Sequence, residues 1–330
     1  MKSLFASMIS IGAYAPKKLL TNADLETMVD TTDEWITKRT GIKTRHIAAD
    51  DQAASDLGYE AAKLAIARSG LLPSDIDLVI VATLSGDYLF MPSTAAVLAG
   101  KLGVRNIPSF DVLAACSGFI YGVATGKAFI ESGMASNVLV VGTEASSRFM
   151  DYTDRSVCIL FGDGAGACVL TATDDESKAI VDVKISGDGT LWDYLTIEGG
   201  SRHPVREGGE HPPFMRMKGN ETFKLAVKTL SADVVEILAR NNLTSEAITH
   251  FIPHQANLRI IKAVGETLKL RDDQIVLTIE RFGNTSAASI PMAINELYES
   301  HKLKTGDLML LDAFGGGLTW GSALVRFGGK

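Results

Sequence analysis

Three side chains in this sequence have types and neighbours suited to nucleophilic chemistry: Cys116, His254 and Asn284. Each stands where a segment typical of a strand gives way to one typical of a helix. Cys116 lies in residues 111–119 (DVLAACSGF), and a thiol at a helix N-terminus gains from free N–H groups and the helix dipole, which favour the thiolate. Its small neighbours would let a substrate approach closely. A buried, unreactive cysteine is the alternative.

His254 and Asn284 are weaker candidates when each is taken alone. His254 ends an apolar strand in PHQAN, and ligands of open α/β sheets collect at the carboxyl ends of strands. A half-buried structural histidine is the alternative. Asn284, in GNTS, could simply fill a left-handed position beside Gly283. Since the remaining histidines lack ligand spacing with cysteine, no metal site is expected.

Composition narrows the class of protein. The chain has 330 residues, 46% hydrophobic and 22% charged, which predicts one large α/β domain or two domains rather than disorder. A net charge of −7 provides no overall basic footprint for nucleic acid. Three cysteines fit a reduced, cytoplasmic enzyme, and no apolar run approaches a membrane span. Residues 1–15 could pass for a short signal peptide, but alternation over residues 5–11 favours a first strand.

Hydrophobic periodicity predicts alternating helices and strands, hence an α/β fold. Helices are expected over residues 22–29, 55–69, 92–102, 118–129, 256–268 and 289–298. Strands are expected over residues 5–11, 76–82, 110–113, 137–141, 162–170, 247–253, 275–279, 307–311 and 321–327. The run at 76–82 (IDLVIVA) is typical of a strand buried on both faces.

The two halves of the chain can be laid over each other. Residues 76–82 match 248–254 at an offset of 172, and Glu131-Ser132 matches Glu299-Ser300 at an offset of 168. The run GACVL at 166–170 resembles GSALV at 321–325, at an offset of 155. We therefore expect two similar halves, residues 1–174 and 175–330, joined at a polar break. Residues 186–217 are rich in Gly, Pro and His and predict a long functional loop.

Two glycine runs, FGDGAGA at 161–167 and FGGG at 314–317, invite a nucleotide-binding interpretation. Neither has the Gly-x-Gly-x-x-Gly spacing between a strand and a helix, and neither contains a phosphate-loop Lys. Close backbone packing is the default expectation, with a backbone N–H donor as the functional option. Cys158 and Cys168 are expected to fill the core.

Several motifs in a fixed order resemble the β-ketoacyl-acyl carrier protein synthase III family, the initiating condensing enzymes of type II fatty acid synthesis. The resemblance covers essentially the whole chain. The matching motifs are NADL (22–25), DEW (33–35), RTGI (39–42), AAC (114–116), FGDGAGA (161–167), Gly219-Asn220, PHQANLRII (253–261), GNTSAAS (283–289) and AFGGGLTWGSALVRF (313–327).

The resemblance implies a thiolase-like fold, five layers in the order αβαβα, and a homodimer. Cys116 would take an acyl group from acetyl-CoA or another short acyl-CoA, and malonyl-acyl carrier protein would then condense with it after losing CO₂. His254 and Asn284 would donate hydrogen bonds to the charge that develops during decarboxylation. The backbone N–H groups of Cys116 and Gly316 would bind the acyl-transfer oxyanion.

The resemblance also implies binding residues, with CoA as substrate and no cofactor. The expected CoA and pantetheine contacts are Trp35, Arg39, Arg155, Asn220, Phe223 and Asn257. The expected carrier-protein contacts are Gln255, Ala256, Asn257, Leu258 and Arg259. Before Pro92, where better-known members carry a Phe that shapes the partner subunit's acyl pocket, this chain has Met91, preceded by Phe90. Met is more flexible, so the starter chain length stays open.

Four alternatives remain. A condensing enzyme that extends with malonyl-CoA, of the polyketide kind, would use the same Cys, His and Asn. A thiolase would need a second catalytic Cys near the C-terminus, and residues 315–317 contain none. A Cys-His-Asn protease has the same chain order but lacks the expected surroundings of its Cys. A non-catalytic scaffold is disfavoured by the three intact residues.

Overall fold

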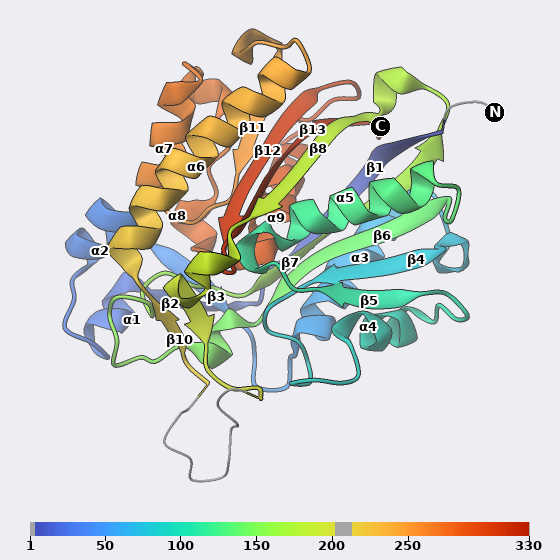
Figure 1. Cartoon of the computed structure of the whole chain (residues 1–330). Coiled ribbons are helices and arrows are strands. Elements are labelled where there is room, and N and C mark those ends of the chain that lie inside the picture. Colours follow the sequence, from blue (N-terminus) through green and yellow to red (C-terminus); the bar gives the residue numbers. More distant parts are fainter. Residues whose placement is uncertain (1–3, 202–212, 330) are drawn as a thin grey trace.

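The computed structural model describes residues 4–201 and 213–329, which form two β-sheets with helices between and outside them (Figure 1). The first sheet has the strand order β1-β7-β6-β4-β5. The bounds of its strands are β1 (Phe5–Tyr14), β4 (Leu78–Ala82), β5 (Ser109–Val112), β6 (Asn137–Glu144) and β7 (Gly164–Thr173). β4 runs parallel to β5 and β6, whereas β7 is antiparallel to both β6 and β1.

The second sheet has the order β11-β12-β13-β8. Its strands are β8 (Ile180–Gly187), β11 (His250–Pro253), β12 (Leu308–Gly315) and β13 (Thr319–Arg326). β11 is parallel to β12, and β13 is antiparallel to both β12 and β8. The two sheets therefore share one strand arrangement: β1-β7-β6-β4 in the first sheet corresponds, strand by strand, to β8-β13-β12-β11 in the second.

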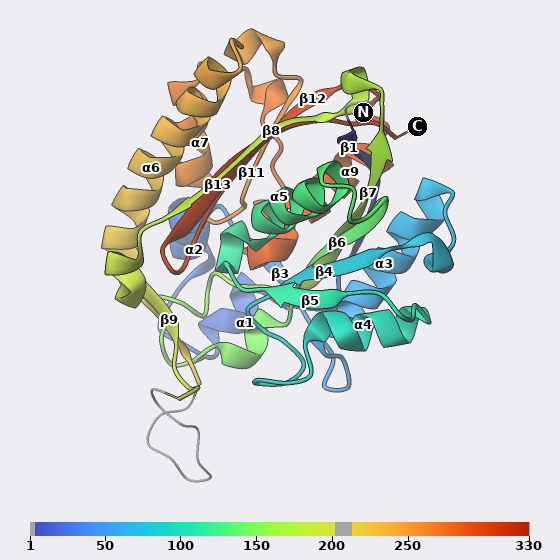
Figure 2. The same ribbon diagram turned by 45° about the vertical axis from the view of Figure 1, so that its right-hand side comes forward.

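Helices complete five layers, αβαβα (Figures 1 and 2). The central layer is α5 (Gly118–Glu131) with α9 (Ser289–Glu299), and both helices contact strands of the two sheets. α3 (Ala54–Ser69) and α4 (Thr94–Leu102) cover the outer face of the first sheet, and α6 (Gly219–Arg240) and α7 (Leu258–Thr267) cover that of the second. The thiolase-like, pseudo-duplicated architecture is confirmed, whereas the boundary at residues 174/175 stays a prediction.

Shorter elements complete the described residues. Two small ribbons pair β2 (Lys18–Thr21) with β3 (Thr44–Ile47) and β9 (Leu195–Ile197) with β10 (Met215–Met217). The short α-helices are α1 (Asn22–Glu26), α2 (Asp33–Thr40) and α8 (Ile279–Phe282). The 3₁₀ turns are η1 (Pro73–Asp75), η2 (Ala115–Ser117), η3 (Ser146–Phe149), η4 (Glu176–Lys178), η5 (Gly189–Tyr194), η6 (Ser245–Ala247), η7 (Asp272–Gln274) and η8 (Ser286–Ala288).

Sequence patterns explain why the main elements form. Every residue of β4 (LVIVA) is buried, as expected for a strand covered on both faces. α3 meets β1 closely because β1 has a glycine: a Cβ at Gly12 would stand 2.5 Å from the Ala61 carbonyl oxygen. The hydroxyl of Ser93 caps α4, and Gly103 ends it in the left-handed conformation.

Three expectations about elements need correction. Residues 275–279 do not form a strand: Ile275 makes one isolated bridge to Phe251, and then Gln255 takes up the neighbouring backbone groups with its side-chain amide. The first helix ends at Glu26 instead of residue 29. Residues 186–217 contain the end of β8, η5 and the β9–β10 ribbon, so this segment is less irregular than expected, although residues 202–212 lie outside the described residues.

In residues 4–201 and 213–329, no helix is both long and apolar enough to cross a membrane.

A paired glycine test measures how tightly the two halves meet. A Cβ at Gly142, in β6, would stand 2.3 Å from the Ala287 carbonyl oxygen of η8. We expect Gly142→Ala to lower the free energy of unfolding in urea by about 1–3 kcal/mol, as overpacking does. Gly58→Ala, in α3, is the control: its nearest contact would be an ordinary 3.5 Å, and it should stabilise by about 0.5–1 kcal/mol. Equal stabilities would contradict this packing.

Candidate active site

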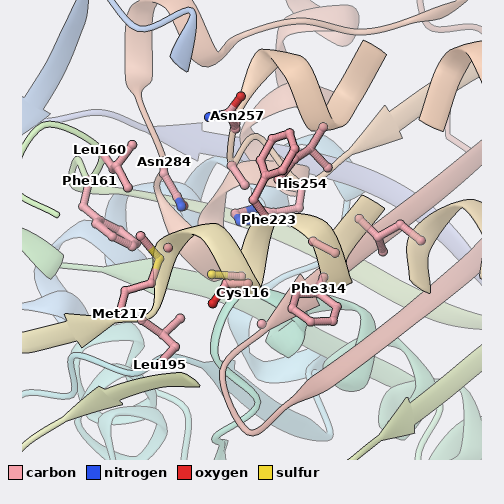
Figure 3. Close-up of a pocket in the computed structure, with 17 residues that line it drawn as sticks. Cys116, Leu160, Phe161, Leu195, Met217, Phe223, His254, Asn257, Asn284 and Phe314 are labelled. Atoms are coloured by element: carbon pink, nitrogen blue, oxygen red, sulfur yellow. The ribbon is translucent and has the colours of Figure 1, made fainter. Parts of the chain in front are cut away.

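The structure brings Cys116, His254 and Asn284 to one buried pocket (Figure 3). Cys116 is the middle residue of η2 and precedes α5, His254 follows β11, and Asn284 lies between α8 and η8. All three are at most 5% exposed. These positions are 138 and 30 residues apart in sequence, so only the stacking of the two sheets can assemble them.

His254 is held as a neutral hydrogen-bond donor. Its backbone N–H donates to Asp312 at 2.7 Å, and its Nδ1 lies 2.6 Å from the Ser289 hydroxyl at the start of α9. That hydroxyl accepts the Gln255 backbone N–H at 3.4 Å, so its own proton is available for Nδ1. This arrangement favours the tautomer with the ring proton on Nε2, which is buried and has no hydrogen-bond partner among the described residues. Burial lowers the pKa of His254 to about 3.

Asn284 is oriented by its neighbours. Its Oδ1 accepts the Ser286 backbone N–H at 2.9 Å, which leaves the NH₂ end of the amide free to donate. Its backbone N–H donates to Leu160, and its carbonyl accepts the N–H of Gly162. Asn284 does not adopt a positive φ; Gly283 and Ser286 do, at 64° and 47°. The alternative in which Asn284 merely fills a left-handed position is therefore not supported.

Cys116 is a thiol at rest. Burial and, to a smaller extent, the Glu144 carboxylate raise its pKa to about 12, against the lowering effect of the Ser286 hydroxyl and its own backbone N–H. The expectation that the helix N-terminus favours thiolate is therefore wrong for this state, because desolvation of the charged form outweighs the donors. The residue before it, Ala115, has a φ of 43°, so the nucleophile turn is strained.

The FGGG run packs directly against this turn. A Cβ at Gly315 would stand 2.7 Å from the Cys116 backbone nitrogen, so only glycine fits. The Ser117 hydroxyl donates to Thr319 at 2.8 Å, and the Thr319 hydroxyl lies 3.0 Å from the carbonyl oxygen of Ala114 and 3.1 Å from that of Gly316. This hydroxyl pair ties the segment that carries the Gly316 amide to the segment that carries the nucleophile.

Residues of α6 and α7 form one wall of the pocket. Phe223 and Asn257 line it, whereas Asn220 is exposed and does not. The Asn257 amide donates to the Arg39 carbonyl at 3.0 Å, and its oxygen caps α7. Asn257 thus joins the helix that carries Arg39 to the pocket wall.

Trp35 lies between two cations. The guanidinium carbons of Arg39 and Arg155 lie 4.6 and 5.0 Å from the centre of its ring. Arg155 also donates to the Asp30 carbonyl at 2.6 Å. Sequence reasoning placed all three residues near one ligand group, and the structure brings them together at the molecular surface.

The expected carrier-protein stretch divides into buried and exposed residues. Gln255 is 1% exposed and its amide bonds internal backbone groups, so it cannot contact a docked protein directly. Ala256, Asn257 and Leu258 are half-buried. Arg259 is exposed, and its guanidinium carbon lies 5.0 Å from the Phe223 ring centre, at the pocket wall.

A second cavity, of about 700 Å³, also reaches Cys116. Phe90 lines it and is nevertheless 73% exposed. Met91 is 82% exposed and does not line it. Leu195 and Phe161 border both cavities, which places Cys116 between two spaces.

Sequence reasoning missed Ser289, Thr319, Ser286 and Glu144. Their signal was weak, since polar residues near a motif are common. Ser286, Ser289 and Glu144 are distinguished by burial. Thr319 is half-buried and is distinguished by its hydrogen bonds at the nucleophile turn. Over residues 4–201 and 213–329, no group of three or more His, Cys, Asp or Glu side chains could hold a metal ion. Cys158 and Cys168 are buried and unpaired.

Known proteins resemble this chain along its whole length. The family model for 3-oxoacyl-[acyl-carrier-protein (ACP)] synthase III matches residues 110–189, and the model for its C-terminal part matches residues 238–327. A beta-ketoacyl-[acyl-carrier-protein] synthase III from Sulfurovum sp. (strain NBC37-1) is 62% identical, over 100% of this chain and 98% of its own.

The chain belongs to the β-ketoacyl-[acyl-carrier-protein] synthase III family. The crystal structure of the Aquifex aeolicus VF5 synthase III is 43% identical, with a TM-score of 0.90 over 98% of this chain and 100% of its own. The priming β-ketosynthase from the R1128 polyketide biosynthetic pathway is 34% identical, with a TM-score of 0.93 over 98% of this chain and 96% of its own. The resemblance drawn from the motifs is thereby confirmed.

The state of His254 can be tested without substrate. Because it is buried and Ser289 donates to its Nδ1, we expect ¹⁵N NMR of histidine-labelled protein to show a neutral ring with the proton on Nε2 from pH 8 down to pH 5. The signal is assigned by its loss in His254→Ala. A titration of this ring near pH 6.5 would contradict the assignment.

Proposed function

We propose that this chain catalyses the initiating condensation of bacterial fatty acid synthesis. The acyl group of acetyl-CoA, or another short acyl-CoA, is transferred to Cys116. Decarboxylative condensation with malonyl-[acyl-carrier protein] then gives 3-oxoacyl-[acyl-carrier protein] and CO₂. The observation that carries the proposal is one buried pocket lined by a thiol and by two side-chain donors, His254 and Asn284.

In the first half-reaction, the sulfur of Cys116 attacks the thioester carbonyl, and negative charge moves onto the carbonyl oxygen. The backbone N–H groups of Cys116 and Gly316 are the proposed donors to that oxygen. Support comes from the packing of the FGGG run against the nucleophile turn and from the bonds through Ser117 and Thr319. Collapse of the intermediate releases CoA and leaves an acyl-Cys116 thioester.

In the second half-reaction, loss of CO₂ from the malonyl thioester places negative charge on its thioester oxygen. Nε2–H of His254 and the NH₂ group of Asn284 are the proposed donors. Neither has to ionise, so a histidine kept neutral by burial suits this role. A preorganised donor of this kind contributes roughly 2.7–4 kcal/mol to transition-state stabilisation. The resulting enolate attacks the acyl-Cys116 carbonyl.

CoA and the carrier's pantetheine are proposed to enter from the side of α2, α6 and α7. The Trp35 ring would stack on the adenine, with Arg39 and Arg155 beside the ring and the phosphates. Phe223 and Asn257 would line the pantetheine path, and Asn220 would contact it only at its outer end. CoA is a substrate here, and no cofactor or metal is part of the proposed reaction.

The acidic carrier protein is proposed to dock beside Arg259, the exposed cation of the stretch that also includes Ala256, Asn257 and Leu258. The overall charge of −7 does not oppose this, because docking needs only a local basic site. A cytoplasmic setting is proposed from the substrates and from the three unpaired cysteines.

A homodimer is proposed as the working assembly. Exposed apolar side chains cluster beside the second cavity, and such a patch is typical of an interface. They are Tyr88, Leu89, Phe90, Met91 and Leu113, from 58% to 82% exposed. In the dimer, Met91 would reach the acyl pocket of the partner subunit and help set the starter length.

A condensing enzyme of polyketide synthesis is the second candidate, favoured by the similarity to the R1128 priming synthase. Arg259 beside Phe223 gives a docked acidic protein a cation at the pocket wall. Comparing turnover with malonyl-acyl carrier protein and with malonyl-CoA separates the two.

His254→Ala tests the division of labour between the half-reactions. Since His254 serves only the decarboxylation, we expect Cys116 to be acetylated within about twofold of the wild-type rate, while malonyl decarboxylation falls about 10²–10³-fold. Both are measured by mass spectrometry and CO₂ release. If acetylation fell as much as decarboxylation, the separate roles would be wrong.

Arg259→Glu tests carrier docking. We expect KM for malonyl-acyl carrier protein to rise about tenfold, corresponding to about 1.4 kcal/mol, with acetylation by acetyl-CoA unchanged. Lys302→Glu is the matched control, since Lys302 is an exposed cation in the turn beyond the far end of α9. Equal KM values for the two variants would exclude Arg259 from the docking surface.

A further inference from the structure

Arg45, the second residue of β3, is a fully buried cation: its side chain is 0% exposed. Its hydrogen-bond partners among the described residues are all neutral oxygens. Burying a guanidinium against neutral partners is costly, and an apolar side chain of similar volume could fill such a core position instead. The presence of Arg45 therefore calls for a role that an apolar side chain would not perform.

The guanidinium of Arg45 binds three oxygens from separate segments. Its Nη1 donates to the side-chain oxygen of Asn22 at 2.8 Å and to the Leu20 carbonyl at 3.3 Å, and its Nη2 donates to the Ile159 carbonyl at 2.5 Å. Leu20 belongs to β2 and Asn22 begins α1, whereas Ile159 is 114 residues beyond Arg45. Arg45 thus ties the β2–β3 ribbon to residues 159–162.

Residues 159–162 hold the backbone of Asn284 through two hydrogen bonds. The carbonyl of Leu160, the residue after Ile159, accepts the Asn284 N–H at 2.9 Å. The Gly162 N–H donates to the Asn284 carbonyl at 3.0 Å. A shift of this segment would therefore also move the side-chain amide that Asn284 presents to the pocket (Figure 3).

Arg45 also packs directly against the two glycines beside this contact. A Cβ at Gly162 would stand 2.9 Å from the Cβ of Arg45, and a Cβ at Gly283 would stand 3.3 Å from it. Gly283 immediately precedes Asn284 and has a φ of 64°. The stem of Arg45 therefore contacts both strands of backbone that meet at Asn284, while its guanidinium fixes the Ile159 carbonyl.

On its other side, the network reaches the helix that carries Trp35. Nδ2 of Asn22 donates to Oδ1 of Asp33 at 2.7 Å and to the Ile42 carbonyl at 2.8 Å. Asp33 is the first residue of α2. The charge of Arg45 is thus linked by hydrogen bonds through one side-chain amide to a carboxylate, which is how a buried polar network can be satisfied.

We propose that Arg45 is a positioning residue for Asn284. The proposal rests on the role of Asn284 as a donor in the proposed condensation. By binding the Ile159 carbonyl, Arg45 fixes residues 159–162 where they hold the Asn284 backbone. The NH₂ group of Asn284 is thereby aimed at the place where charge develops on the malonyl thioester oxygen.

The other two site residues are held by different contacts. The backbone N–H of His254 donates to Asp312 in β12, and Cys116 lies in η2, which packs against Gly315. Removing the guanidinium of Arg45 should therefore disturb decarboxylation and spare acyl transfer to Cys116.

Arg45→Met keeps most of the side-chain volume and removes the guanidinium. Both half-reactions are followed by mass spectrometry and CO₂ release, and each rate is divided by the number of sites that acetyl-CoA can acetylate. Per site, we expect malonyl decarboxylation to fall about 10²-fold, because a misplacement of about 1 Å costs that much. Acetylation per site should stay within about twofold of wild type. A merely structural role would lower the number of sites and leave the ratio of the two rates unchanged.

Arg45→Lys is the second variant and decides the matter if Arg45→Met does not fold. It keeps the positive charge but loses the planar guanidinium that reaches Asn22 and Ile159 at once. We expect decarboxylation per site to fall about tenfold, with acetylation again within about twofold of wild type.

Arg68→Met is the matched control. Like Arg45, Arg68 binds a backbone carbonyl and an asparagine side chain, those of Ile11 and Asn295, at 2.9 and 2.8 Å. Neither partner lines the pocket of Cys116. Arg68→Met should lower stability without changing the ratio of decarboxylation to acetylation.

A measurement without substrate separates this proposal from the proposed function. In protein labelled with ¹⁵N-asparagine, the side-chain NH₂ signals of Asn284 are assigned by their loss in Asn284→Ala. We expect these signals to shift in Arg45→Met and to stay in place in Arg68→Met.

An unchanged ratio of decarboxylation to acetylation in Arg45→Met and Arg45→Lys, or Asn284 signals that do not shift, would overturn the proposal. If wild-type protein accepts no acetyl-CoA while the Asn284 signals do shift in Arg45→Met, the proposed starter is wrong and the positioning role of Arg45 stands.

Discussion

Two short turns, η2 and η8, meet at the centre of the molecule where the carboxyl ends of the two sheets face each other, and the remaining site depends on this contact. Each turn contains one non-glycine residue at positive φ, Ala115 and Ser286. The absence of a side chain at Gly142 lets the Ala287 carbonyl pack directly against β6. The surrounding packing therefore fixes a strained geometry that neither turn would keep alone.

Burial at this contact sets the protonation of every group nearby. It keeps Cys116 as a thiol, holds His254 neutral and raises the pKa of Glu144 to about 7. A neutral His254 suits a donor to developing negative charge, whereas a buried thiol is a poor nucleophile until its proton is taken. The same desolvation thus favours the condensation step. In the acyl-transfer step, however, it means that the Cys116 thiol must first lose its proton.

Much of the fold could be predicted from the sequence, because its signals are local. The all-buried run of β4 and the alanine-rich α3 have patterns that few other structures satisfy. The repeat was visible because β4 with β11, and β7 with β13, occupy equivalent places in their sheets. The strand expected at residues 275–279 failed because the side chain of Gln255, distant in sequence, takes the place of a neighbouring strand.

Part of the candidate site could likewise be predicted from the sequence, and part of it could not. Cys116 and His254 could be named from motifs because each follows a strand that forms, whereas Asn284 was named from its motif although the strand predicted before it does not form. Their protonation could not, because the helix-terminus argument for Cys116 contains no term for burial. Ser289 was missed for a related reason: its hydroxyl matters only because the fold brings it 2.6 Å from Nδ1 of His254.

The most direct test of a covalent condensing mechanism is the intact mass of the protein after incubation with acetyl-CoA, with peptide mapping, and again after malonyl-acyl carrier protein is added. We expect one acetyl group, about 42 Da, on Cys116. The second substrate should remove it, and Cys116→Ala should never carry it. An adduct on another residue, or one that malonyl-acyl carrier protein leaves in place, would contradict the assignment of Cys116 as the nucleophile of a two-step condensation.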